Sequence, residues 1–119
     1  MTKKYSLLYA YNMWAWLELH PTKTKKDYFN ARPQLKETLL CSLCVYDTYT
    51  SAIIPCITCP MCYCWPSTNS HRSHEKCNDT HSCYNSWKKG INKGRNAGDI
   101  AQAIWTQYKL EEWYLNKVN

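Results

Sequence analysis

Apolar residues recur at helical intervals near the start of the sequence. Between Lys3 and His20 they include Leu7 and Trp14, two helical turns apart, and Pro21 follows directly. Because residues seven apart share one side of a helix and proline stops a helix, the pattern predicts a helix that ends near His20. Trp16 and its neighbours extend the apolar surface round most of this helix, which indicates packing on more than one side or a surface for a partner.

A second amphipathic pattern begins near Asp99, a residue suited to the positive end of a helix. We expect a C-terminal helix over about residues 98–116. Its apolar stripe consists of Ile100, Ala101, Ile104, Trp105, Tyr108 and Leu115. The basic stretch before it, residues 88–95, is broken by glycines and predicts at most a hinge.

The segments between these helices carry weaker signals. Thr24 and Asp27 have the spacing of a capping box, which predicts a short turn of helix from Lys25. Pro33 suits the first turn of another helix, over residues 34–40.

Two further segments are described by their composition. Residues 45–54 are rich in β-branched and aromatic side chains, which favours a short strand or hairpin arm. Residues 60–86 combine Pro, Ser, Thr, Asn and His without periodicity, which predicts a long loop tied down at its cysteines.

Eight cysteines in 119 residues indicate either a disulfide framework or thiolates that hold a metal. A secretory signal would favour disulfides. The apolar stretch from Tyr5 to Leu19, however, contains Asn12 and Glu18 and lacks the small residues that a signal peptidase requires. It is also too short and too interrupted to cross a bilayer. We therefore expect a cytoplasmic protein with reduced thiols and no membrane contact.

Four of the cysteines form two C-x-x-C pairs, Cys41 with Cys44 and Cys56 with Cys59. A C-x-x-C turn places two thiolates on one side of a tight loop, so two facing turns complete a tetrahedron of sulfur ligands. The pattern predicts a structural Zn²⁺ site with these four ligands. Pairing of Cys59 with Cys62 stays open for the second turn, and an iron–sulfur cluster is the chemical rival.

The apolar residues of the chain include 10 Tyr, 6 Trp and 8 Cys, a supply that suits a small core organised around a cross-link. We predict a small α-rich (α+β) zinc-stabilised domain, with N-terminal and C-terminal helices around a four-cysteine zinc-knuckle loop core. No internal repeat or domain boundary is visible, so residues 1–119 are expected to form a single zinc-binding domain.

Further metal donors lie in or beside the predicted long loop. Cys62, Cys64, His74, Cys77 and His81 supply enough ligands for a second metal site, although their spacing fits no established motif. The alternative is that these residues are loop thiols and solvated histidines, because histidines in loops are ordinarily exposed.

No catalytic constellation is apparent. The sequence lacks a nucleophile with its base, a carboxylate pair or a phosphate loop at a persuasive spacing. A zinc ion with four thiolate ligands has no open position at which to activate water. We therefore expect no enzymatic activity and no small-molecule substrate.

The formal charge of +6 is a mild basic bias, compatible with nucleic acid or an acidic protein surface. Four basic residues, Lys88, Lys89, Lys93 and Arg95, follow the aromatic residues Tyr84 and Trp87. Such a segment is a candidate phosphate-binding patch with stacking partners, or a solvated basic loop.

A spaced pattern covers most of the chain. It consists of Met13-Trp14-Ala15-Trp16-Leu17, Pro21, Lys23, Lys25, Asp27-Tyr28, Cys41-x-x-Cys44, Tyr46, Cys56-x-x-Cys59-Pro60-Met61, Trp65, Cys77, Tyr84, Trp87, Ala97 and Ile100-Ala101. This pattern resembles that of small, mostly uncharacterised cysteine-rich proteins of tailed bacteriophages. Cys62, Cys64 and Cys83 go beyond it, as does the long loop.

The resemblance implies a zinc-knuckle core and a setting in the cytoplasm of an infected bacterium, and it implies no reaction. Small phage proteins of this kind often bind a host protein, and several are similar to inhibitors of defence nucleases such as CRISPR effectors. The expected function is binding of a host protein through residues such as Trp16, Lys88, Lys89, Lys93 and Arg95. The alternative is a nucleic-acid-binding zinc module that uses the segment from Lys88 to Arg95.

Overall fold

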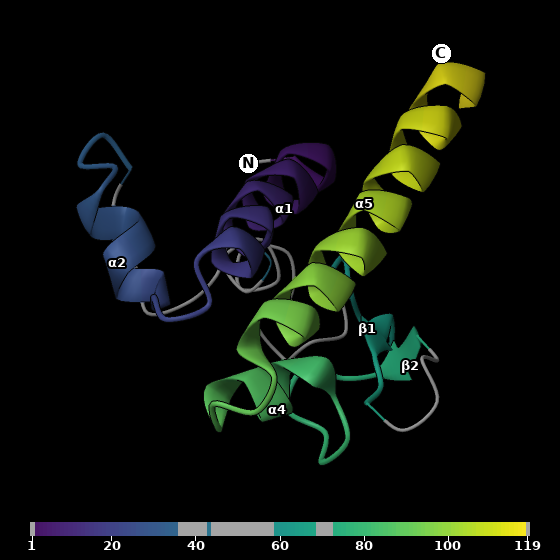
Figure 1. Ribbon diagram of the computed structural model, residues 1–119. Helices are drawn as coiled ribbons and strands as arrows, with labels where there is room; N and C mark the ends of the chain where they lie inside the picture. Colours follow the sequence, from purple (N-terminus) through teal and green to yellow (C-terminus); the bar gives the residue numbers. More distant parts are fainter. Residues whose placement is uncertain (1, 36–42, 44–58, 69–72, 119) are drawn as a thin grey trace, which may run out of the picture.

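Two long antiparallel helices form the frame of the molecule. The computed structural model describes residues 2–35, 43, 59–68 and 73–118, without the side chains of residues 73 and 74. Helix α1 (Lys3–Leu19) and helix α5 (Lys93–Val118) lie side by side (Figure 1). Lys3 and Lys4 form ion pairs with Glu111 and Glu112, at 3.6 and 3.7 Å, so the start of α1 lies beside the second half of α5.

Helix α1 confirms the predicted N-terminal helix. Thr2 caps it by accepting a hydrogen bond from the Tyr5 N–H group, at 3.1 Å, and His20 follows its last residue. Its buried face consists of Ser6, Leu7, Ala10, Met13, Trp14 and Leu17. Leu19, which the apolar pattern includes, is 76% exposed because it lies on the opposite side of the helix.

Helix α2 (Lys25–Asn30) begins at the predicted capping box. The Thr24 hydroxyl accepts a hydrogen bond from the Asp27 N–H group, and the Asp27 carboxylate accepts one from the Thr24 N–H group, at 3.2 and 2.8 Å. These bonds to Thr24 lower the pKa of the Asp27 carboxyl group. Gln34 and Leu35 are not helical, and the rest of the turn predicted over residues 34–40 lies outside the described residues.

The segment predicted as one long loop contains regular elements. Strands β1 (Trp65–Pro66) and β2 (Ser73–Glu75) pair antiparallel, with Trp65 opposite Glu75. Helix α4 (Cys83–Lys88) follows, and the Ser82 hydroxyl caps it by accepting from the Asn85 N–H group. The strands could not be predicted from the sequence, because two or three residues are too few to show an alternation of apolar and polar side chains. The strand or hairpin predicted over residues 45–54 lies outside the described residues.

Helix α5 begins earlier than the predicted start near Asp99, and it contains two glycines that were expected to interrupt it. A Cβ atom at Gly94 would lie 3.5 Å from the carbonyl oxygen of Glu18, and one at Gly98 would overlap the Glu18 carboxylate. The glycines therefore allow the end of α1 to approach α5 closely. Packing between the two helices compensates for the low helix propensity of glycine.

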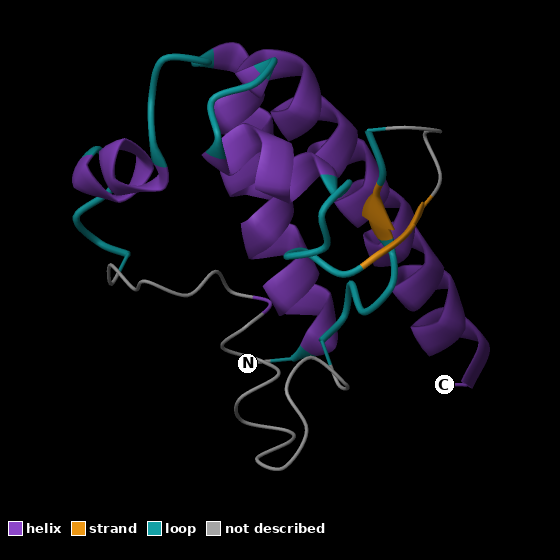
Figure 2. Ribbon diagram, turned by 90° about the horizontal axis from the view of Figure 1, so that it is seen from below, coloured by secondary structure: helices purple, strands orange, loops and turns teal. Residues whose placement is uncertain are grey.

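The hydrophobic core lies between the helix pair and the segments that cover it. Seen from below, the β1–β2 pair lies on one side of the helix pair and α2 on the other (Figure 2). The buried apolar residues are Leu7, Ala10, Met13, Trp14, Leu17, Tyr28, Leu43, Met61, Trp65, Cys83, Trp87, Ala97, Ile100, Ala101 and Ile104. The expectation of an α-rich molecule with helices at both ends is confirmed; zinc stabilisation stays a prediction.

Candidate functional site

Four aromatic side chains from three elements meet at the centre of the molecule. Trp14 of α1 is fully buried, and its ring is edge-on to Trp87, Tyr84 and Trp65, with centroids 4.9, 5.6 and 6.4 Å away. Edge-to-face rings place the positive edge of one against the negative face of another. This aromatic cluster (Trp14, Trp65, Tyr84 and Trp87) therefore joins α1, β1 and α4 into one unit.

The aromatic cluster is held by ring packing. The indole N–H groups of Trp14 and Trp87 are buried, and neither has a hydrogen-bond partner among the described residues. Both tryptophans are buried among the other rings of the cluster, so we assign them a structural role.

Three lysines from different elements border the aromatic cluster. The Lys25 amino group donates a hydrogen bond of 2.9 Å to the Tyr84 hydroxyl, and the Lys88 amino group lies 4.7 Å from the centre of the same ring. The Lys93 amino group lies 4.9 Å from the Trp87 ring and donates to the Lys23 carbonyl group. We call Lys25, Lys88 and Lys93 the basic corner. Its ammonium groups are attracted by the ring faces.

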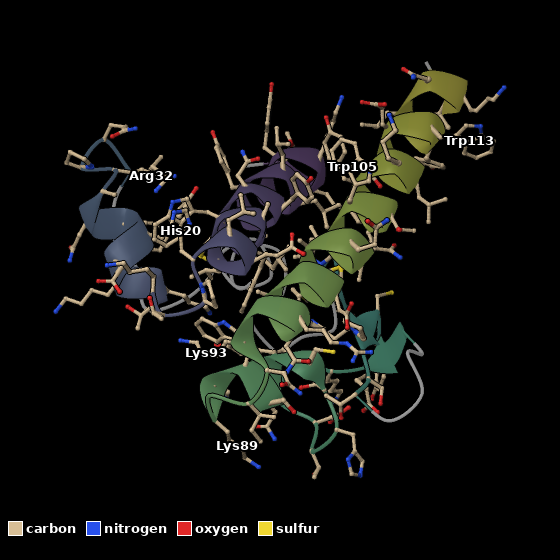
Figure 3. All side chains as sticks on the ribbon, in the orientation of Figure 1. His20, Arg32, Lys89, Lys93, Trp105 and Trp113 are labelled. Atoms are coloured by element: carbon tan, nitrogen blue, oxygen red, sulfur yellow. The ribbon has the colours of Figure 1, made fainter. Side chains whose placement is uncertain are left out.

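The basic corner contains two of the four predicted basic residues. The other two, Lys89 and Arg95, are exposed at the end of α4 and near the start of α5. Lys25 was not predicted, because it lies 59 residues before Tyr84 in the sequence and only the fold brings them together. Figure 3 shows Lys93 beside the space between α2 and α4, with Lys89 at the outer edge.

Trp16, the other predicted partner-binding residue, connects α1 to α2. Its ring is half-buried, stacks on His20 with centroids 4.2 Å apart, and meets Tyr28 edge-on at 5.5 Å. The Arg32 guanidinium group lies 5.3 Å from the Trp16 ring (Figure 3). Much of the Trp16 side chain is therefore engaged inside the molecule.

The end of α5 carries an exposed apolar surface that the sequence patterns did not single out. We define the solvent-facing stripe as Leu110, Trp113, Tyr114 and Val118, which are 55%, 60%, 55% and 58% exposed. Their spacing of three, four and eight residues places them on one side of the helix. Figure 3 shows Trp113 pointing away from the body of the molecule. The helical spacing of these apolar residues is visible in the sequence. The spacing does not indicate whether they face the core or the solvent.

The cysteines of the predicted zinc site are only partly within the described residues. Cys41, Cys44 and Cys56 lie outside them, whereas Cys59 is described and half-buried against the core. Among the residues that the structure describes, no three Cys, His, Asp or Glu side chains gather in a way that could hold a metal ion. The zinc site therefore stays a prediction.

The residues of the predicted second metal site are spread over two segments. Cys62 and Cys64 lie in the turns before β1, Cys77 and His81 follow β2, and the His74 side chain is not described. The described members of this set do not gather in threes.

Cys83 is a structural thiol. It is 1% exposed at the start of α4, and burial, together with nearby Asp99, raises its pKa to about 11. The thiol stays protonated near neutral pH, so it is a poor nucleophile and a poor metal ligand.

Comparisons with protein families, with curated proteins and with solved structures found no match for this chain. No helix among the described residues is long and apolar enough to cross a bilayer.

Proposed function

We propose that this chain is a non-enzymatic, zinc-binding phage protein that docks on a protein of its bacterial host through the end of α5. The observation that carries the proposal is the solvent-facing stripe: four large apolar side chains on one side of a helix, each more than half exposed. Amphipathic helices present residues at this spacing to apolar grooves of partner proteins. Tryptophan and tyrosine are the residues most enriched among energetically dominant interface contacts.

Charge near the stripe indicates what kind of groove fits it. The Lys117 amino group lies 5.7 Å from the Trp113 ring and has no ion pair among the described residues. Glu112 is already paired with Lys109 at 2.7 Å and with Lys4. Among the described residues, the charge beside the stripe that has no ion-pair partner is therefore positive, and we expect the partner to present an apolar groove with an acidic rim.

The end of α5 is already helical in the free chain. The ion pairs of Lys3 and Lys4 join it to α1 at Glu111 and Glu112, and the stripe residues Trp113, Tyr114 and Val118 follow within two turns. A preformed helix loses less conformational entropy on binding than a segment that folds on its partner. Among host proteins, we propose a defence nuclease such as a CRISPR effector as the target to be tested first.

The zinc part of the proposal is supported by two core residues. Leu43 precedes Cys44 directly, and Met61 follows Cys59 by two residues; both side chains are fully buried in the same hydrophobic core. The described neighbours of Cys44 and Cys59 therefore lie in one core, which supports a single site for the two C-x-x-C pairs. Four thiolates on one ion would close such a site and leave it structural.

Docking is tested with the variant Trp113→Ala combined with Leu110→Ala. The partner is first captured from host lysate and purified, and its binding to the natural chain and to the double variant is then measured. We expect the dissociation constant of the double variant to be at least about 30-fold higher, which corresponds to a loss of about 2 kcal/mol, the size of one dominant interface contact. The matched control is Leu19→Ser, which removes a more exposed apolar side chain far from the stripe. A partner that binds the double variant as tightly as the natural chain contradicts the proposal.

Nucleic-acid binding is the second candidate, and the basic corner favours it. Lys25 joins the predicted basic segment in space, so basic residues of α2, α4 and α5 lie on one corner. The combined variant Lys25→Gln, Lys88→Gln and Lys93→Gln tests it. The binding constant for a single-stranded nucleic acid is plotted against salt concentration, both as logarithms, and we expect the slope to become shallower by roughly 0.7 for each phosphate contact that is lost. The control replaces Lys117 at the far end of α5. Absence of binding at low salt eliminates this candidate.

A further inference from the structure

One side of α1 is rich in apolar residues that the fold leaves exposed. Five residues recur there at alternating intervals of four and three positions: Tyr5, Tyr9, Asn12, Trp16 and Leu19. This spacing keeps them on one side of the helix, because two helical turns contain about seven residues. Tyr5, Tyr9 and Leu19 are 54%, 47% and 76% exposed, and Asn12 is exposed as well. We call Tyr5, Tyr9, Asn12 and Leu19 the outer face of α1.

The outer face carries no charged side chain, although surface helices ordinarily present charged residues to water. Helix α1 has three charged residues, and all of them lie toward α5. Lys3 and Lys4 form ion pairs with glutamates of α5, and the Glu18 carboxylate lies against Gly98. The exposed side of α1 is therefore left to tyrosine, asparagine and leucine, which is typical of a surface that another protein covers.

Trp16 marks the limit of the outer face toward α2. Its ring meets Tyr28 edge-on at 5.5 Å and lies 5.3 Å from the Arg32 guanidinium group, so α2 covers it in part. Figure 1 shows α2 beside α1, on the other side from α5. The four residues of the outer face stay exposed in this arrangement.

Three properties of the outer face fit a second copy of this chain. Its alternating intervals are those of helices that pair as coiled coils. The formal charge of +6 makes two copies repel each other, and an uncharged face allows them to approach at the lowest electrostatic cost. Asn12 lies seven positions after Tyr5 and seven before Leu19, so it is at the centre of the face. Its amide group both donates and accepts hydrogen bonds, so it can pair with an identical group.

We propose that two copies of this chain form a symmetric dimer through the outer face of α1, with Asn12 of each copy opposite Asn12 of the other. In a twofold interface centred on this residue, the two asparagines meet whether the helices run parallel or antiparallel. A single asparagine among apolar seam positions fixes the register of such a pair.

The size of the outer face indicates a weak dimer. An aromatic side chain buries about 150–250 Å², so the exposed halves of Tyr5 and Tyr9 provide roughly 200 Å² per copy. Stable interfaces bury about 800 Å² on each partner, and smaller ones are typical of weak complexes. We expect a dissociation constant in the micromolar range.

The first test is sedimentation equilibrium of the natural full-length chain under reducing conditions, which prevent disulfide bonds between copies. The average mass should rise with concentration from that of one chain to that of two, as mass action requires. A chain that stays monomeric at about 1 mM, well above a micromolar dissociation constant, overturns the proposal.

The second test places charges at the centre of the outer face. Asn12→Asp and Asn12→Lys should each raise the dissociation constant at least about tenfold, because like charges then lie opposite each other. An equal mixture of the two variants should dimerise again, because unlike charges then meet. Circular dichroism should show unchanged helix content, because Asn12 is exposed.

The matched control places the same charges on an exposed position of α5. Gln102→Asp and Gln102→Lys should leave the dissociation constant within about threefold of the natural value. Equal weakening by the Asn12 and Gln102 variants overturns the proposed interface, and so does a mixture of the Asn12 variants that stays monomeric. A dimer that survives both Asn12 variants and is lost with Trp113→Ala also overturns it, and assigns the contact to the solvent-facing stripe.

Discussion

Replacement of Trp14 by alanine is expected to lower the free energy of unfolding by about 3–5 kcal/mol. Trp14 is 0% exposed and contacts the rings of Trp65, Tyr84 and Trp87, so its removal leaves a cavity where α1, β1 and α4 meet. A loss of that size is a large fraction of the stability of a small domain, typically about 5–15 kcal/mol. Denaturant titration followed by tryptophan fluorescence and circular dichroism measures it.

Two matched variants separate packing from other effects. Trp14→Phe keeps an aromatic ring and removes an indole N–H group that has no partner among the described residues, so we expect a smaller loss, about 1 kcal/mol. Trp113→Ala removes a tryptophan that is 60% exposed and should change stability by no more than about 0.5 kcal/mol. Equal losses for Trp14→Ala and Trp113→Ala would show that the aromatic cluster does not organise the core.

Removal of zinc is expected to have an effect at least as large. Structural zinc sites contribute about 10–16 kcal/mol of apparent binding free energy, which exceeds the usual stability of a small domain. Because Leu43 and Met61, next to the proposed ligand segments, are fully buried in the core, loss of the ion should release part of that core. We expect the chelated chain to lose its cooperative thermal transition in circular dichroism.

The control for this experiment is the addition of zinc to the chelated chain, which should restore the thermal transition. Magnesium should not restore it, because thiolates bind zinc and bind hard, oxygen-preferring cations weakly. Native mass spectrometry should find one zinc ion per chain before chelation. A chain that contains no metal and melts at the same temperature after exhaustive chelation would refute the proposed site.

Local signals in the sequence determined helix α1 and the start of helix α2. The limits of α1 follow from the apolar repeat and from Pro21, and the start of α2 follows from the Thr24–Asp27 capping box. Both signals act within a few residues, so they operate in the same way in any surroundings. The central part of the final helix was likewise predictable from Ile100 and Ile104, which are fully buried as expected.

Only the tertiary structure decided the start of α5 and the pairing of β1 with β2. Glycine has low helix propensity, and Gly94 and Gly98 are helical because the end of α1 packs against them. The strands are two and three residues long, and their pairing depends on segments that the sequence pattern does not relate.

The candidate surfaces also combine features that the sequence shows with features that only the fold determines. The basic residues and the helical spacing of the solvent-facing stripe can be read from the sequence, because composition and periodicity are properties of neighbouring positions. Whether an apolar stripe is buried, and whether Lys25 meets Tyr84 across 59 positions, depends on which elements pack together. Burial and long-range proximity are consequences of the whole fold, and no local pattern contains them.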